Sequence, residues 1–242
     1  MTITSHHNAK LKEIRKLSQR RRWRDQAARF VAEGEDLLAA ADAAGWEPVE
    51  RYCAAGSGLP GVEVEPELLA SASGLGSGTR ALAVYEERWA PAPIGPVCVY
   101  LHGVHDPGNV GAVLRSAQAF GAASVALGPG TADPFGPKAV RASMGAVFAV
   151  PVSRADDVAA LPGTTIALVA ARGEPLAEVS RFNRAPRGQN VTLLIGSERE
   201  GLPEEVIAGA AHVAHIPIET ESLNAAMAAT VALYEITRMA PA

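Results

Sequence analysis

The alternation of apolar and polar residues changes along the chain near residue 90. Before that point, short apolar runs alternate with helically spaced segments and with glycines such as Gly34 and Gly45. A basic helical segment is predicted over residues 3–29. Short strands are predicted at residues 30–32, 49–54, 61–64 and 81–85. Residues 1–90 are therefore expected to form a small α/β domain.

Beyond residue 96 the chain contains longer apolar runs, most of them separated by helical patterns. Strands that are buried on both faces of a parallel sheet have such near-continuous apolar sequences. The runs lie at residues 97–101, 124–127, 165–170, 191–195 and 213–218. Residues 97–242 are therefore predicted to form an α/β domain with a mostly parallel sheet flanked by helices. The proline-rich residues 91–96 are predicted to be a stiff linker between the two domains.

The composition is that of a globular protein with a substantial apolar core. Of the 242 residues, 48% are hydrophobic, and no apolar run approaches the ~20 residues of a membrane span. The N-terminus lacks the apolar core of a signal peptide. The two cysteines, Cys53 and Cys98, have neither metal-binding nor disulfide-scaffold spacing. We therefore expect a cytoplasmic protein.

Positive charge is concentrated at the N-terminus, although the whole chain has a net charge of −4. Residues 1–24 contain a single acid, Glu13, and eight basic residues. The basic residues are Lys10, Lys12, Arg15, Lys16, Arg20, Arg21, Arg22 and Arg24. A basic arm on an acidic body offers a patch that can bind phosphates. A solvated basic helix without a partner would have the same composition.

Polar residues follow the predicted strand at 97–101, where a helix is expected to begin. Asp106 suits an N-cap, and Pro107 suits the first helical position, where its missing N–H has no consequence. Arg115 lies off the apolar stripe of this helix and is expected to face solvent, a groove or a ligand. The predicted buried stripe consists of Val110, Val113, Leu114 and Ala117.

The strand at 191–195 also ends in a segment suited to binding. It leads into Gly196, Glu198 and Gly201, and the two glycines leave the backbone open to close approach by a ligand. Glu198 is suited to accept hydrogen bonds from a ligand or from a nearby arginine. A capping role for Glu198 at the following helix is the alternative interpretation.

The third polar junction lies within residues 212–234, where a buried strand leads into a long alanine-rich helix. A capped helix with Glu221 or Ser222 as the N-cap is one interpretation of this junction, and a binding site is the other. The apolar face predicted for this helix consists of Leu223, Met227, Val231 and Tyr234.

The three junctions are expected to form one site, because the carboxyl ends of parallel strands meet at one edge of a sheet. Their residues closely resemble three ordered motifs of the SpoU/TrmH family of RNA ribose 2′-O-methyltransferases. These are Asp106–Ala112 with Arg115 and Ala117, Gly196–Glu198 with Gly201 and Leu202, and Ile216–Pro217 with Ser222–Asn224. Lys138–Ala146, Ile3–Ser5, Asn8 and Phe30–Gly34 also resemble family segments, the last three in its RNA substrate-binding domain. The resemblance therefore covers nearly the whole chain.

The resemblance implies a deep trefoil knot, S-adenosylmethionine as cofactor and a homodimer. The implied reaction is attack of an RNA ribose 2′-hydroxyl on the sulfonium methyl group. The residues at the family's functional positions are Asn109, Arg115, Glu198, Ser222 and Asn224. The residues expected to line the cofactor pocket are Leu168, Ala170, Ala171, Gly173, Ile195, Gly196, Glu198, Ile216, Ile218 and Leu223.

The chemistry of arginine argues against Arg115 as the base, because a guanidinium stays protonated and has no acceptor. We expect Arg115 to grip an RNA phosphate bidentately and to orient the hydroxyl, with Glu198 holding the site geometry. Asn109 and Asn224 are expected to fix the cofactor loops and the ribose. The segment Glu219–Glu221 is shorter and more acidic than in the family, which is expected to affect cofactor affinity or the approach of phosphates.

Ribosomal RNA is favoured over transfer RNA, because the substrate-binding domain resembles that of family members acting on large RNAs. Two other classes compete: an RNA-binding or ribosome-assembly protein of the same fold with weak or no methyl transfer, and a small-molecule methyltransferase. No metal is expected. His102 with His105, and His212 with His215, have HxxH spacing, but residues three apart on a strand point to opposite faces.

Overall fold

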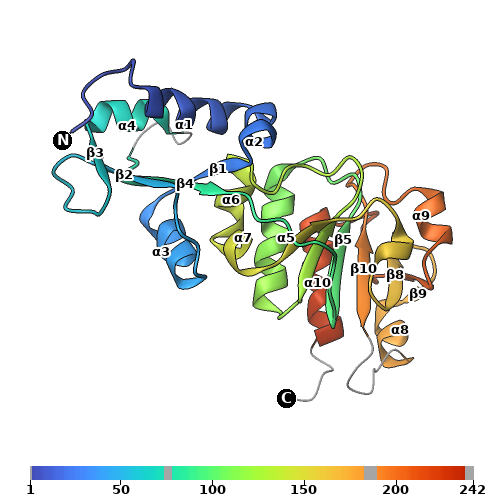
Figure 1. Ribbon diagram of the computed structural model, residues 1–242. Coiled ribbons are helices and arrows are strands. Elements are labelled where there is room, and N and C mark those ends of the chain that lie inside the picture. Colours follow the sequence, from blue (N-terminus) through green and yellow to red (C-terminus); the bar gives the residue numbers. More distant parts are fainter. Residues whose placement is uncertain (1, 74–77, 183–189, 238–242) are drawn as a thin grey trace. The chain divides into compact units, whose positions relative to one another are not determined.

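The computed structural model describes residues 2–73, 78–182 and 190–237, and the chain forms two compact units (Figure 1). The first unit consists of residues 1–88 and 133–149, and the second of residues 89–132 and 150–242. The chain therefore passes from one unit to the other three times. The predicted domain 97–242 is not one unit, because residues 133–149 pack with the N-terminal residues.

The first unit is built on a four-stranded mixed sheet in the order β1-β4-β2-β3. Its strands are β1 (Arg29–Glu33), β2 (Glu50–Ala54), β3 (Val62–Val64) and β4 (Ala81–Glu86). Its helices are α1 (Ala9–Gln19), α2 (Arg21–Ala27), α3 (Glu35–Ala43), α4 (Pro66–Ala72), α6 (Pro137–Ser143) and α7 (Ala146–Ala149). The segment predicted as one basic helix is two helices, because Arg20 has an extended backbone between α1 and α2.

The two faces of this sheet have different cores, because successive residues of a strand point to opposite sides. Figure 1 shows α1 and α4 on one side and α3 on the other. The core under α1 and α4 is mostly aliphatic and includes Leu11, Ile14, Leu17, Val31, Leu68, Leu69, Leu82 and Val84. The core on the opposite side is aromatic.

The aromatic core is completed by the inserted segment 133–149. It consists of Phe30, Trp46, Tyr85, Phe135 and Phe148, whose contacting rings have centroids 4.9 to 6.4 Å apart. The Trp46 indole N–H also donates to the Phe148 carbonyl oxygen at 2.8 Å. Each aromatic pair contributes about 0.5–1.5 kcal/mol beyond its buried area. Two of these rings come from the inserted segment, which explains why it packs with the N-terminal residues.

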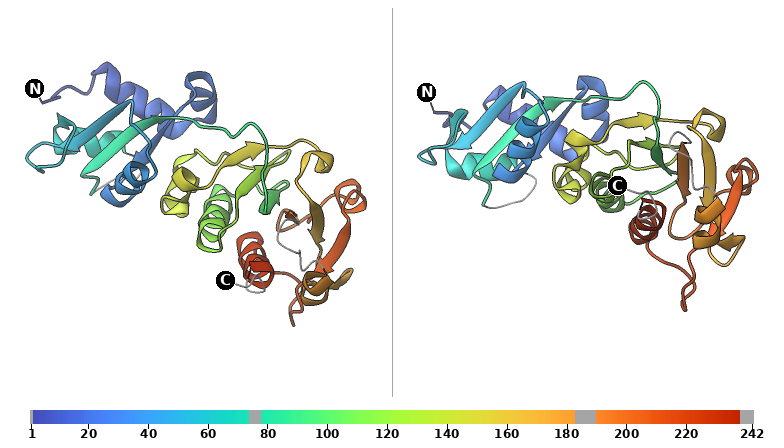
Figure 2. Two further views of the ribbon diagram at one scale, coloured as in Figure 1. Left: turned by 60° about the horizontal axis from the view of Figure 1, so that its bottom comes forward. Right: turned by 90° about the horizontal axis from the view of Figure 1, so that it is seen from below.

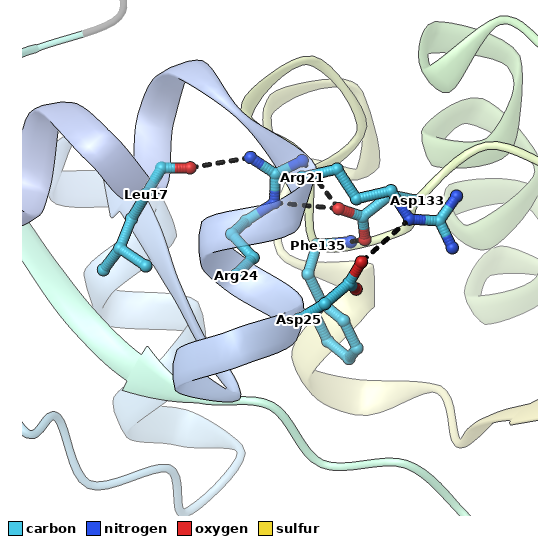
Figure 3. A network of polar contacts seen from close by, with 6 residues as sticks. All are labelled: Leu17, Arg21, Arg24, Asp25, Asp133 and Phe135. Carbon is cyan, nitrogen blue, oxygen red and sulfur yellow. Dashed lines mark hydrogen bonds and ion pairs between the residues drawn. The ribbon is translucent and has the colours of Figure 1, made fainter.

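A buried ion pair also holds the inserted segment (Figure 3). Arg24 Nε donates to Asp133 Oδ2 at 2.8 Å, and its Nη1 donates to the Leu17 carbonyl oxygen at 2.6 Å. Asp133 Oδ1 accepts from the Phe135 N–H at 2.9 Å. Arg24 is only 6% exposed. Arg24 was predicted to bind RNA, and this prediction is corrected. Its guanidinium is almost fully buried and is bound to Asp133 and to the Leu17 carbonyl oxygen.

The second unit contains a parallel seven-stranded sheet in the order β7-β6-β5-β10-β8-β11-β9. Its strands are β5 (Val97–Leu101), β6 (Ser124–Leu127), β7 (Val152–Arg154), β8 (Thr164–Leu168), β9 (Glu174–Pro175), β10 (Val191–Ile195) and β11 (His212–His215). Most positions in β5, β6 and β10 are buried, as their apolar runs predict. The predicted parallel sheet flanked by helices is thus confirmed.

Helices cover both faces of this sheet. They are α5 (Pro107–Ala119), α8 (Leu176–Phe182), α9 (Glu204–Ala208) and α10 (Ala225–Thr237), with a 3-10 turn at Val158–Ala160. Figures 1 and 2 show α5 and α10 side by side, and Ser116 and Thr230 share a hydrogen bond of 2.6 Å between them. Residues of α9 pack into the core on the other face. Among the described residues, no helix combines the length and apolar character of a membrane span.

The apolar face predicted for α10 lies largely on its exposed side. Met227, Val231 and Tyr234 are 62%, 42% and 54% exposed, and Leu223 is half-buried. The buried positions carry mostly small residues: Ala225, Ala226, Ala229, Ala232 and Leu233. Small side chains allow α10 to approach α5 closely, so the larger apolar residues lie on the outside of a single chain.

Candidate active site

A cavity of about 420 Å³ opens at the carboxyl ends of β8, β10 and β11. Its walls are the loops that follow these strands and the first turns of α10. The predicted cofactor-binding residues that line it are Leu168, Ala170, Ile195, Gly196, Glu198, Ile216, Ile218 and Leu223. The volume lies within the range of about 300–1,000 Å³ that is usual for small-molecule sites.

Two residues predicted for the cofactor pocket, Ala171 and Gly173, lie outside this lining. Gly173 has φ +75°, and a Cβ there would lie 2.0 Å from the Val213 carbonyl oxygen. Its role is close packing of the chain against β11. Val169 and Ser197, which lie within the predicted ranges 168–173 and 195–198, also line the cavity. The lining residues that were not predicted as cofactor-binding include Arg199, Glu200, Gly201, Leu202, Glu221, Ser222, Ala225 and Ala228. Most of these residues are neighbours in the sequence of residues that were predicted, so extending the predicted segments would have identified them.

The loop after β10 folds back on itself at the cavity wall. Ser197 and Gly201 exchange backbone hydrogen bonds of 3.2 and 3.1 Å. A Cβ at Gly196 would lie within 2.1 to 2.4 Å of the Gly201–Leu202 backbone. Glycine is therefore required at position 196, and the turn presents backbone groups and the Glu198 side chain at the cavity wall.

Three polar side chains from the three junctions form a hydrogen-bonded chain. The Asn224 side-chain NH₂ donates to Asn109 Oδ1 at 3.1 Å. The Asn109 NH₂ in turn donates to a carboxylate oxygen of Glu198. Asn109 belongs to the first turn of α5, Glu198 to the loop after β10, and Asn224 to the start of α10. The structure thus brings the predicted functional residues Asn109, Glu198 and Asn224 together.

The direction of this chain is fixed by the cap of α10. Asn224 Oδ1 accepts from the backbone N–H groups of Ala226 and Met227 at 2.9 and 3.3 Å, so Asn224 is the N-cap. Its NH₂ group must therefore point to Asn109, whose NH₂ must point to Glu198. The N-cap expected at Glu221 or Ser222 was assigned to the wrong residue. Both side chains instead line the cavity and are exposed.

The first junction is folded as predicted. Asp106 Oδ1 accepts from the Gly108 N–H at 2.6 Å as the N-cap of α5, and Pro107 occupies the first turn. Val110, Val113, Leu114 and Ala117 are fully buried. Arg115 is exposed, and no hydrogen bond or ion pair joins its guanidinium to another residue of the described chain. Its cation is therefore available to an external anion.

Acidic groups surround the cavity. Glu198, Glu200 and Glu221 line it together with a single basic residue, Arg199. Glu221 belongs to the short acidic segment Glu219–Glu221, whose side chains are exposed. This arrangement favours a ligand with positive charge over an anionic one.

His102, one of the histidines with HxxH spacing, lies beside Tyr100. The Tyr100 hydroxyl and His102 Nδ1 are 3.1 Å apart. Burial lowers the pKa of His102, against the opposing charge of Glu205, and raises the pKa of Tyr100 to about 12. Both groups are therefore mainly neutral near pH 7. Within residues 2–73, 78–182 and 190–237, no group of three or more His, Cys, Asp or Glu side chains could hold a metal ion.

The basic residues of the N-terminal arm differ in their surroundings. Lys10 pairs with Glu50, Arg21 lies 3.6 Å from Asp25, and the half-buried Arg15 donates to Ser71 Oγ at 3.1 Å. The exposed members of the arm are Lys10, Lys12, Lys16, Arg20, Arg21 and Arg22. With Arg24 buried, these residues and Arg15 form the basic surface of the first unit.

Comparison with known proteins agrees with this geometry. Residues 96–234 match the SpoU rRNA Methylase family, and residues 8–87 match the MRM3-like substrate binding domain. A crystal structure of an AdoMet-bound rRNA methyltransferase from Sinorhizobium meliloti superimposes with a TM-score of 0.87 at 30% identity, covering 100% of this chain and 99% of that one.

Two curated relatives are similar in sequence. The 23S rRNA (guanosine(2553)-2′-O)-methyltransferase RlmP of Bacillus subtilis is 28% identical over 64% of this chain and 69% of its own length. Ribosomal RNA small subunit methyltransferase G 2 of Syntrophobacter fumaroxidans is 33% identical over 98% of this chain. The chain spans 49% of that second relative. From the family match over residues 96–234 and the geometry of the site, we conclude that this chain belongs to the SpoU rRNA methylase family.

Proposed function

We propose that this chain transfers a methyl group from S-adenosylmethionine to a ribose 2′-hydroxyl of RNA, and that the RNA is ribosomal. The observation that carries the proposal is the hydrogen-bonded chain of Asn224, Asn109 and Glu198, because Glu198 also lines the 420 Å³ cavity. The relatives from B. subtilis and S. meliloti bear names of rRNA methyltransferases, which favours ribosomal over transfer RNA.

The residues of the cavity fit S-adenosylmethionine. Apolar side chains such as Leu168, Ile195 and Ile216 can surround an adenosine, and the Gly196–Gly201 turn offers backbone groups for its polar atoms. The carboxylates of Glu200 and Glu221 complement the positive sulfonium and ammonium groups. When bound, this cofactor supplies an electrophilic methyl group.

The protein's contribution to the reaction is positioning. Glu198 is held by Asn109, so its carboxylate is oriented before a substrate arrives. Arg115, which has no partner among the described residues, grips the phosphate beside the target nucleotide through two parallel N–H donors. An Arg115→Lys variant keeps the positive charge but loses the two parallel N–H donors of the guanidinium. The rate of methyl transfer should therefore fall strongly. Near-full transfer by the variant at neutral pH would contradict the bidentate role.

We also propose that two copies of the chain pair through the exposed face of α10. Met227, Val231 and Tyr234 form an apolar face on one helix, and Tyr234 contacts Phe120 with ring centroids 6.1 Å apart. Exposed apolar residues that lie together on a helix favour association. The proposal also includes a trefoil knot in the second unit. It further includes a cytoplasmic location for the protein.

Calorimetric titration of the purified full chain with S-adenosylmethionine tests the proposed function. We expect saturable binding, and Glu221→Gln should weaken it more than it weakens binding of S-adenosylhomocysteine, which lacks the sulfonium charge. Lys12→Ala, which changes an exposed residue of α1, is the control. RNA binding without any cofactor binding would instead identify an RNA-binding or ribosome-assembly protein of the same fold.

A further inference from the structure

The corner between α1 and α2 carries two exposed cations over one partly buried tryptophan. Lys16 Nζ lies 4.7 Å from the centroid of the Trp23 ring, and Arg22 Cζ lies 5.0 Å from the ring. The ring quadrupole attracts cations at these distances. Trp23 therefore limits the positions that two otherwise flexible charged side chains adopt.

The backbone of this corner is itself fixed. The Arg20 N–H donates to the Lys16 carbonyl oxygen at 3.2 Å, and the Trp23 N–H donates to the Arg20 carbonyl oxygen at 3.1 Å. The buried Arg24 ties α2 to the last turn of α1 through the Leu17 carbonyl oxygen, as Figure 3 shows. The backbone that carries the Trp23 indole ring is thus held in place by these hydrogen bonds.

Neither cation is neutralised by a carboxylate. Lys10 and Arg21, at the same surface, have acidic partners, but Lys16 and Arg22 have no ion pair with any residue of the described chain. Both cations lie against the neutral Trp23 ring, which does not cancel their charge, so the charge can still attract an external anion. A protein that held cations only for its own stability would be expected to pair them with acids.

We propose that Lys16 and Arg22 form a binding site for the phosphate backbone of RNA, with Trp23 as the residue that positions them. This inference rests on the proposed function and assigns part of RNA binding to one corner of the first unit. Holding both side chains in advance reduces the conformational entropy that they lose on binding. Because the ring is partly buried beneath the cations, the site offers charge instead of a stacking surface, so it contacts phosphates and not bases.

A Trp23→Ala variant tests the site, because it leaves every charge in place. The full chain is titrated with a fluorescein-labelled 23S ribosomal RNA transcript over a series of salt concentrations. We expect Trp23→Ala to bind about fivefold more weakly with an unchanged salt dependence, and Trp23→Phe to recover most of the loss. Lys16→Ala and Arg22→Ala should each reduce the slope of log K against log salt by about 0.7–0.9.

A double-mutant comparison separates positioning from structural damage. In a chain that already carries Lys16→Ala and Arg22→Ala, Trp23→Ala should cause no further loss of affinity. Equal binding by the wild type and Trp23→Ala would refute the site and leave the proposed function intact. A further loss in that background, or a lowered unfolding temperature that Trp23→Phe does not restore, would also refute it. Failure of the wild type to bind the transcript would refute both proposals.

Discussion

At the scale of single residues, Asn224 links the fold of the second unit to its chemistry. Its side-chain oxygen caps α10 and its side-chain nitrogen starts the hydrogen-bonded chain to Asn109 and Glu198. An amide is required for both tasks, because it carries an acceptor and a donor on one planar group. The same cap therefore stabilises α10 and orients the Glu198 carboxylate.

An Asn224→Asp variant separates the two tasks. Aspartate caps a helix as well as asparagine does, so the free energy of unfolding should change by less than about 0.5 kcal/mol. Its carboxylate cannot donate to Asn109, so either that contact or the contact to Glu198 is lost, and methyl transfer should fall about 100-fold. Thermal unfolding measures the change in stability, and the rate of methyl transfer measures the change in activity.

Asn224→Ala is the control variant, because it also loses the cap and should lower the free energy of unfolding by about 0.5–2 kcal/mol. Wild-type activity in Asn224→Asp would contradict the proposed role of the Asn224 amide.

Arg24 marks the limit of prediction at this scale. It follows Arg20, Arg21 and Arg22 in a basic run, and nothing local distinguishes it. It is buried because it pairs with Asp133, which lies 109 positions away in the sequence. A sequence pattern reports the spacing of neighbours along a helix, so it could not identify this partner.

At the scale of elements, several strands and the buried stripe of α5 could be predicted from the sequence. The bounds of β5, β6 and β10 agree with their apolar runs. β11 ends earlier than its run, because Pro217 has no N–H to donate to a neighbouring strand. The three polar junctions could be placed at one sheet edge because the strands were predicted to be parallel, whereas the Asn109–Glu198–Asn224 contacts could be identified only in the folded chain.

The exposed apolar face of α10 leads to a prediction at this scale. Apolar residues at helical spacing indicate a face that is buried. The spacing does not show whether the core of the same chain or a partner chain buries that face. We expect the 25.1 kDa chain to be a dimer by light scattering and Met227→Glu to be a folded monomer, because a charge on the pairing face is desolvated. Gln26→Glu, an exposed change on α2, should stay dimeric. A monomeric wild type would contradict the pairing.

At the scale of the whole molecule, the first unit is completed by residues 133–149, which lie between two segments of the second unit in the sequence. The isolated fragment 1–90 lacks Phe135, Phe148 and Asp133, so its aromatic core is incomplete and Arg24 is unpaired. We expect this fragment to show no cooperative thermal transition and little near-ultraviolet circular dichroism. Joining it to residues 133–149 through a Gly/Ser linker should restore both. Cooperative unfolding of fragment 1–90 alone would show that the inserted segment is dispensable.

The central claim is that the site at the carboxyl edge of β8, β10 and β11 methylates ribose. The most direct measurement incubates the full chain with ribosomal RNA and S-adenosylmethionine bearing a deuterated methyl group, followed by mass spectrometry of the digested nucleosides. We expect the label in a 2′-O-methylnucleoside, with at least about a 100-fold lower rate for Arg115→Lys. Label on a base, or no label in ribosomal RNA, would contradict the account.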